Sequence, residues 1–238
     1  VRFVNEDKEI LDDILSIVKT NFNVSSKKNK YRKNSEAIDL IWWDKNFISW
    51  LQELFNNKKL DSGNKHVPDK ILSANLSAVS NFLAGLFDTD GSVSKGVEYC
   101  SKSEMLTSQV QRLLLRFGII SNVKRRLSYA SNTLNKTRRP YYYLHIYGYE
   151  NVKNFYINIP LRCSHKKTAL ENILKSKVKS NPNVDLLPKE TNKLIKKAVN
   201  LLGIKVKPIR KQYPMLAAYL EDRCCPTRQG LQNVLHLL

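Results

Sequence analysis

Hydrophobic positions recur every three or four residues in several stretches of the chain, which predicts amphipathic helices. The first of these helices covers residues 6–20, and Asn5 or Asp7 can cap its N-terminus. The remaining helices are predicted for residues 47–55, 77–90, 104–116, 149–157, 166–175, 190–202 and 215–222, and a last one begins at Pro226 and Thr227.

Shorter runs of β-branched and aromatic residues lie between these helices and predict strands. They cover residues 1–4, 37–43, 122–130 and 141–147, and residues 92–101 fit a hairpin that turns at Lys95 and Gly96. Residues 25–35 fit a basic polar loop rather than a strand. The mixture of helices and antiparallel hairpins predicts an α+β fold.

The pattern repeats along the chain with a shift of 95 residues. The shift aligns Glu9-Ile10-Leu11 with Glu104-Met105-Leu106, and Phe22-Asn23-Val24 with Phe117-Gly118-Ile119. This self-similarity predicts a duplicated strand–helix unit. Three segments follow from it: residues 1–75, residues 76–178, and a basic helical region at 179–238 that begins with a linker at 179–187.

The helix predicted for residues 77–90 ends in the run Asp88-Thr89-Asp90-Gly91. Glycine inside a helix costs about 1 kcal/mol relative to alanine, so Gly85 beside Ala84 indicates close contact with another helix. Carboxylates are disfavoured at a helix C-terminus, and a bound divalent cation is the simplest reason for two of them. Gly91 is predicted to end the helix in a left-handed conformation.

Two other interpretations of this run compete with a metal site. A buried amphipathic helix with a solvated acidic end has the same pattern. A calcium loop is excluded, because Val93 stands where that loop needs glycine and Tyr99 where it needs glutamate.

The run from Phe82 to Gly91 resembles the second LAGLIDADG motif of homing endonucleases. The likeness extends from about residue 1 to residue 175 and is closest to the two-motif endonuclease domains of archaeal-type inteins. It implies a duplicated LAGLIDADG core of αββαββα units, with a β-saddle on DNA and a C-terminal helical region similar to an accessory DNA-binding region. The implied activity is a site-specific, Mg²⁺-dependent double-strand break in a long DNA target.

The resemblance also assigns roles to single residues. Asp90 is the implied metal ligand, the carbonyl of Thr89 can add a second oxygen, and Asp88 is expected to serve the helix end. Lys65, which precedes Val67 and Pro68, matches the catalytic lysine of the first half. Its counterpart in the second half is Lys166 or Lys167. From composition alone, Lys65 would be one more solvated loop lysine.

The chain carries 40 Lys and Arg against 21 Asp and Glu, a formal net charge of +19. Such an excess favours a polyanionic partner, and the resemblance makes that partner double-stranded DNA. The candidate DNA contacts lie on or near the predicted strands of the second half: Lys95, Lys102, Lys124, Arg126, Arg138 and Arg139. No signal peptide, membrane span or CxxC pair is present, so an intracellular, cytoplasmic protein with reduced cysteines and no membrane partner is expected.

The repeat places the partner of Asp90 about five residues before Val1, so the first motif is expected from an upstream segment or from a second chain. A protein with one motif can also be a non-cleaving LAGLIDADG nucleic-acid-binding protein, such as a transcription regulator or an intron-RNA maturase. A basic RNA-associated structural protein is a further alternative. The sequence has no nucleophilic first residue and no terminal His-Asn pair, so it leaves open whether the parent is an intein or a free-standing enzyme.

Overall fold

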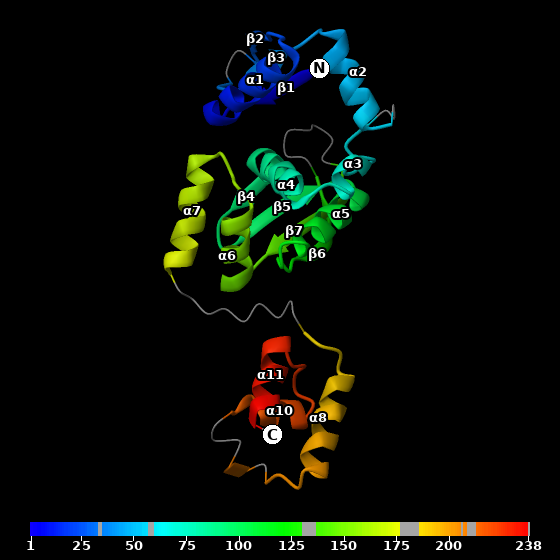
Figure 1. The fold of residues 1–238 in the computed structure, drawn as a ribbon, viewed down its shortest axis with the longest axis vertical. Helices are drawn as coiled ribbons and strands as arrows, with labels where there is room; N and C mark the ends of the chain where they lie inside the picture. The colour runs from blue at the N-terminus through cyan, green and yellow to red at the C-terminus, as the bar shows by residue number, and fades with distance from the viewer. Residues whose placement is uncertain are drawn as a thin grey trace. The chain divides into compact units, whose positions relative to one another are not determined.

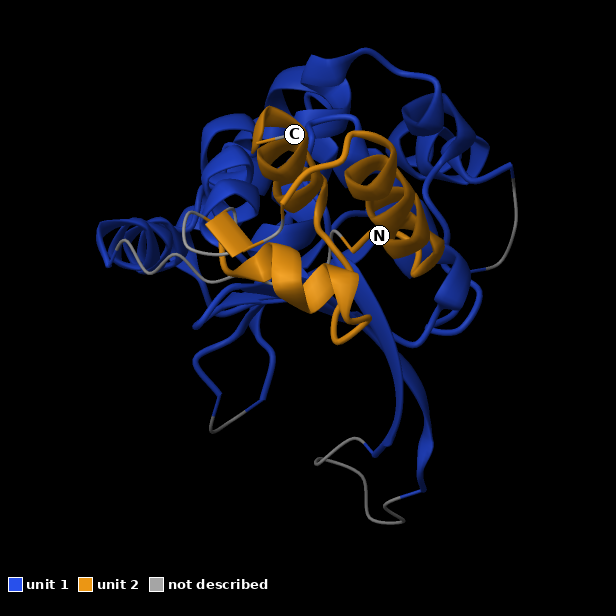
Figure 2. Ribbon diagram, turned by 90° about the horizontal axis from the view of Figure 1, so that it is seen from below, with its two compact units in different colours: residues 1–180 blue, residues 181–238 orange. Residues whose placement is uncertain are grey.

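The structure is a computed structural model that describes residues 1–32, 35–56, 60–129, 137–176, 186–205, 207–208 and 213–237. It divides into two compact units, Val1–Ser180 and Asn181–Leu238, coloured separately in Figure 2. Most of the predicted linker, residues 179–185, lies outside the described residues. The division predicted near residue 75 falls inside the first unit and stays a prediction.

The first part of unit 1 is a small sheet with two helices (Figure 1). Its elements are β1 (Arg2–Asn5), α1 (Lys8–Phe22), β2 (Lys27–Lys30), β3 (Ile38–Ile41) and α2 (Lys45–Leu54). The sheet is antiparallel in the order β1-β3-β2, and Leu40, Trp42 and Phe47 pack with α1 in one apolar cluster. The prediction of a polar loop over residues 25–35 is wrong at Lys27–Lys30, which form the strand β2. That edge strand carries only exposed polar side chains, so it has no alternating pattern to detect.

The second part of unit 1 is larger. Its elements are α3 (Asp69–Leu72), α4 (Leu76–Asp90), β4 (Gly91–Val93), β5 (Val97–Ser101), α5 (Glu104–Leu115), β6 (Asn122–Ser128), β7 (Arg139–Ile146), α6 (Tyr149–Asn158) and α7 (Ser164–Lys175). The antiparallel sheet has the order β4-β5-β7-β6. Its core joins Leu83 and Phe87 of α4 to Leu144 of β7 and Phe155 of α6.

The order of elements confirms the duplication. The succession β1–α1–β2–β3–α2–α3 is repeated as β5–α5–β6–β7–α6–α7, and the sheet orders β1-β3-β2 and β5-β7-β6 correspond. Among the described residues of the first part, α4 and β4 have no counterpart. The described residues therefore contain one repeat that runs from α4 to α7 and the elements of a second repeat that run from β1 to α3.

Unit 2 is helical. It contains α8 (Glu190–Leu201), α10 (Met215–Leu220) and α11 (Arg228–Leu237), which enclose the buried side chains Ile195, Val199, Leu216, Tyr219 and Val234. An ion pair between Lys196 and Asp222 links α8 to the residues after α10. In the described parts of both units, none of the helices has the length and apolar character needed to cross a membrane.

Candidate active site

Helix α4 carries the acidic run and is fixed at both ends by local contacts. The side chain of Asn75 accepts a hydrogen bond from the Ala78 backbone N–H at 2.9 Å and caps the N-terminus. The left-handed stop predicted at Gly91 is wrong, because its φ is −87° and its ψ is 158°. A Cβ at Gly91 would lie 2.5 Å from the Phe87 carbonyl oxygen. Glycine is required there by the close approach of β4 to the last turn of α4.

Asp88 is turned into the protein and is only 4% exposed. Its carboxylate accepts hydrogen bonds from two backbone N–H groups, that of Arg162 at 2.8 Å and that of Cys163 at 3.2 Å. Asp88 therefore fixes the segment before α7 against the end of α4. This agrees with the expectation that Asp88 serves the helix end.

Lys166 is the buried member of the two candidate lysines. Its ammonium group donates to the carbonyl oxygens of Phe87 at 2.8 Å and Asp88 at 2.6 Å. These carbonyls belong to the last turn of α4, where a positive charge is favourable; the Phe87 carbonyl also accepts from the Gly91 N–H. Lys167, by contrast, is exposed. Hydrogen bonds from Ser164 lower the pKa of the Glu9 carboxyl, and the charge of Lys167 adds a smaller contribution.

Asp90 is exposed, and no hydrogen bond or ion pair engages its carboxylate within the described part of the chain. Burial raises the pKa of the Tyr99 hydroxyl, and the charge of Asp90 raises it further. The Thr89 hydroxyl donates to the Gly85 carbonyl at 3.0 Å. A carboxylate in such surroundings fits Mg²⁺, which takes one or two carboxylates and completes its shell with water and phosphate oxygens.

The two small residues of α4 have different surroundings. Ala84 is completely buried in the core of the second part. Gly85 is exposed, and apart from its chain neighbours and the nearby backbone of α4, no described atom lies within 4 Å of a Cβ built on it. The predicted contact of Gly85 with a second helix therefore stays a prediction, and it needs a helix from outside the described residues.

The loop of Lys65 is anchored at α5. The Lys65 carbonyl accepts a hydrogen bond from the Ser103 hydroxyl at 2.5 Å, and the Val67 N–H donates to Gln109 at 2.8 Å. Lys102 precedes the same end of α5 and lies near Asp61. The structure therefore places Lys65 and Lys102 near the N-terminus of α5, whereas Lys166 contacts the C-terminal end of α4.

Three of the predicted DNA contacts share one face of the larger sheet. The register pairs Lys124 with Tyr143 and Ser128 with Arg139, and Arg126 follows Lys124 by two residues on the same face. This face is opposite to the buried Leu144 and Ile146. The Arg126 guanidinium lies 5.4 Å from the centre of the Tyr143 ring, which orients it over the sheet. Arg138 is exposed just before β7.

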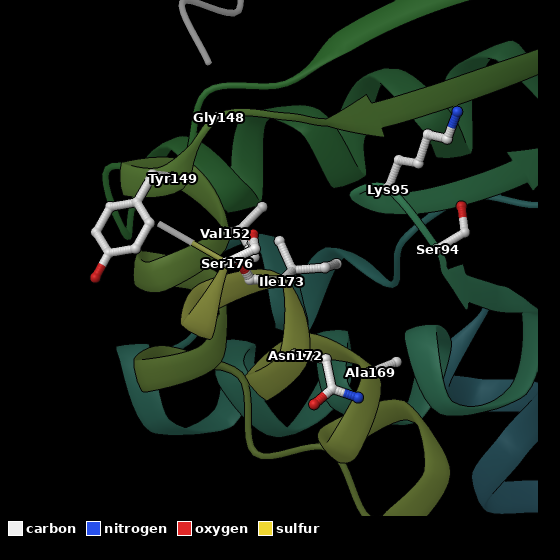
Figure 3. A pocket seen from close by; sticks show the side chains of 9 residues that line it. All are labelled: Ser94, Lys95, Gly148, Tyr149, Val152, Ala169, Asn172, Ile173 and Ser176. Carbon is white, nitrogen blue, oxygen red and sulfur yellow. Dashed lines mark hydrogen bonds between the residues drawn. The ribbon is translucent and has the colours of Figure 1, made fainter. Parts of the chain in front are cut away.

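Lys95 lies elsewhere, in the turn between β4 and β5. It lines a cavity of about 640 Å³ that is formed by this turn, the start of α6, and α7 (Figure 3). Of the predicted site residues, Lys95 alone is among the side chains that line this cavity in the described structure.

Sequence reasoning missed a set of contacts between α1 and the start of α7. Asp7 accepts from the Cys163 thiol at 2.9 Å, Glu9 accepts from the Ser164 N–H at 2.6 Å, and Arg162 pairs with Asp13 at 2.6 Å. The repeat contained a signal for them. A shift of 95 residues aligns residues 160–164 with residues 65–69. The loop around Lys65 packs on the N-terminus of α5, and α5 is the counterpart of α1 in the repeat.

The duplicated topology and the acidic end of α4 are the features expected from the resemblance to the LAGLIDADG family. Residues 77–160 match the family model described as the LAGLIDADG-like domain. Among solved structures, the chain is similar to I-DmoI in complex with DNA and Ca, with a TM-score of 0.50 and 16% identity over 72% of this chain and 82% of that one.

Two curated relatives come from Methanocaldococcus jannaschii. One is the ATP-dependent DNA helicase Hel308, 36% identical over 53% of this chain. The other is a probable translation initiation factor IF-2, 30% identical over 75%. The matches span only 11% and 15% of these relatives' lengths. The family match shows a LAGLIDADG-like domain at residues 77–160, and the fold of the chain is similar to that of I-DmoI.

Proposed function

We propose that this chain acts as a site-specific endonuclease that makes double-strand breaks in DNA with Mg²⁺ at Asp90. The observation that carries the proposal is the state of the α4 C-terminus. Asp90 is exposed there and has no partner among the described residues, while Asp88 and Lys166 hold the same turn in place through buried contacts. A helix end that is anchored so firmly can present one carboxylate in a fixed direction.

The bound ion would activate water and stabilise charge on the scissile phosphate. The chain's own residues position the substrate. Lys124, Arg126 and Arg139 share an open sheet face, where they can neutralise phosphates, and Arg126 can also pair with a guanine edge. Lys166 donates to backbone carbonyls, so its part is to position the α4 end. Lys167 is exposed and is the better candidate for a lysine that contacts phosphate.

The relatives support a mobile module of the intein type. A helicase and an initiation factor have unrelated activities, yet each shares with this chain a segment that makes up a small part of its length. A segment common to such different proteins is best explained as a module inserted into them. We therefore propose that the chain derives from the endonuclease module of an intein.

One observation favours a second function. The exposed face of α4 around Gly85 has no partner helix in the described residues, so the described chain presents one motif only. In the absence of a second acid, the basic sheet face can bind nucleic acid without cutting it. A non-cleaving regulator or RNA maturase is the corresponding alternative.

The test uses the chain, alone and together with a segment that supplies a second LAGLIDADG motif, and a library of randomised DNA duplexes in Mg²⁺, from which cut ends are sequenced. The proposed function predicts recurrent cutting at one sequence, loss of cutting in Asp90→Asn, and full cutting in the control Asp12→Asn, an exposed acid of α1. Sequence-selective binding without any nick supports the non-cleaving alternative. Equal cutting by Asp90→Asn rejects the role of Asp90.

A further inference from the structure

Asp7, Cys163 and His165 form a cluster of three metal-binding side chains outside the Asp90 site. One ligand atom from each lies within 4.8 Å of the others. Asp7 Oδ2 is 2.9 Å from the Cys163 sulfur and 3.5 Å from His165 Nδ1. Asp7 caps α1, whereas Cys163 and His165 lie at the start of α7. The cluster thus joins the first part of unit 1 to the last helix of the second part.

The ligand atoms are oriented by neighbouring hydrogen bonds. Asp7 Oδ1 accepts from the Glu9 N–H at 2.9 Å, which leaves Oδ2 directed at the other two side chains. The Cys163 N–H is held by Asp88. Cys163 is buried, and the His165 side chain is 69% exposed. Such supporting contacts are typical of metal sites, where they fix the direction of each ligand.

We propose that Asp7, Cys163 and His165 bind a zinc-class transition-metal ion that joins α1 to α7. Thiolate and imidazole ligands select Zn²⁺ and Co²⁺ over Mg²⁺, so this site is chemically distinct from the one at Asp90. Three protein ligands leave a fourth tetrahedral position for water. With Zn–S near 2.3 Å and Zn–O near 2.0 Å, the sulfur and carboxylate oxygen would separate to about 3.5 Å, a movement of about 0.6 Å from the thiol hydrogen bond.

Cobalt provides a direct measurement, because a thiolate ligand produces a charge-transfer band in the near ultraviolet and a tetrahedral site produces intense visible bands. The full chain, reduced with a phosphine that does not bind metal, is titrated with Co²⁺ and then with competing Zn²⁺. We expect one equivalent to bind and both sets of bands to appear. Loss of His165 should weaken affinity by about tenfold or more, since even outer-shell changes cost roughly 10–100-fold.

The variants separate the cluster from surface binding. Cys163→Ser should remove the charge-transfer band and His165→Ala should weaken binding, whereas the controls Cys100→Ser and His236→Ala should leave both unchanged. His165 is exposed, so its variant folds even if Cys163→Ser does not. With Zn²⁺ at a hundredfold excess over Kd, Tm should rise by roughly 5–10 °C in the parent chain and less in His165→Ala. A parent chain without the band, or a band that survives in Cys163→Ser, overturns the proposal and leaves only a hydrogen-bonded contact.

Discussion

Asp88 and Asp90 lie two residues apart on the same helix end, yet the structure gives them opposite surroundings. The same substitution, aspartate to asparagine, should therefore have opposite effects at the two positions. Asp88 is buried and accepts two backbone N–H groups, whereas Asp90 is exposed and engages neither a hydrogen bond nor an ion pair in the described residues.

The cost at Asp88 follows from its two hydrogen bonds. A bond to a charged acceptor contributes about 1.5–3 kcal/mol, and a buried N–H left without a partner costs about 1–3 kcal/mol. An asparagine side chain at this position would keep one acceptor oxygen but place its amide N–H₂ against a backbone N–H. We expect Asp88→Asn to lose about 2–4 kcal/mol of unfolding free energy, which lowers Tm by about 5–15 °C for a chain of this size.

At Asp90 the sign reverses. Removing a carboxylate from a helix C-terminus relieves about 0.3–1 kcal/mol of unfavourable interaction with the helix dipole. Asp90→Asn should therefore keep or slightly raise Tm while abolishing DNA cleavage. Thermal unfolding followed by circular dichroism measures stability, and a plasmid nicking assay measures cleavage. The reasoning is refuted if both variants lose the same stability, or if Asp88→Asn has the Tm of the parent chain.

Three further predictions concern other charged groups. Lys166→Met should lower Tm by several degrees because the carbonyls of Phe87 and Asp88 lose a charged donor. Lys167→Met should keep the parent Tm and lose cleavage. The reverse pattern would exchange the roles of the two lysines. Arg126→Ala should weaken DNA binding and reduce the salt slope by about 1 in a filter-binding titration, while Arg112→Ala, on α5, should not. Hydrogen bonds, first from Lys196 and then from Asn192, lower the pKa of the Asp222 carboxyl from 3.8. The stabilising contribution of Asp222 is therefore complete above about pH 5 and is lost as the pH falls through the lowered pKa. Urea unfolding of Asp222→Asn should show a weaker acid dependence of stability than the parent chain, and an unchanged acid dependence contradicts the assignment.

The sequence contained most of the fold because its pattern is repeated. The apolar spacing of α1 and α5 and the hairpin at Lys95 and Gly96 are local signals, and the shift of 95 residues correctly indicated two copies of one topology. The strand β2 escaped detection because Lys27–Lys30 buries no side chain. A strand at a sheet edge that is held by backbone pairing alone leaves no mark in the hydrophobic pattern.

The site was predictable only in part. The run Asp88-Thr89-Asp90-Gly91 identified the helix end, but the two donors to Asp88 lie 74 and 75 residues away in the chain. The buried position of Lys166 depends in the same way on tertiary contact, so the sequence left Lys166 and Lys167 as equal candidates. Contacts between α1 and α7 were visible only as a consequence of the repeat.

The division of labour at the end of α4 has a geometric origin. In an α-helix, residues two apart point about 200° away from each other, so one acid of the pair faces the protein and the other faces outward. The inward acid holds the segment before α7, and the first turn of α7 brings Lys166 back to the carbonyls of the same α4 turn. The unfavourable placement of two carboxylates at a helix C-terminus is thereby offset at Asp88 by backbone donors and an ammonium group. It remains uncompensated at Asp90, where within the described residues the chain supplies no partner of its own. A cation bound between Asp90 and a phosphate would complete that compensation, which is why the outward acid alone should be dispensable for folding.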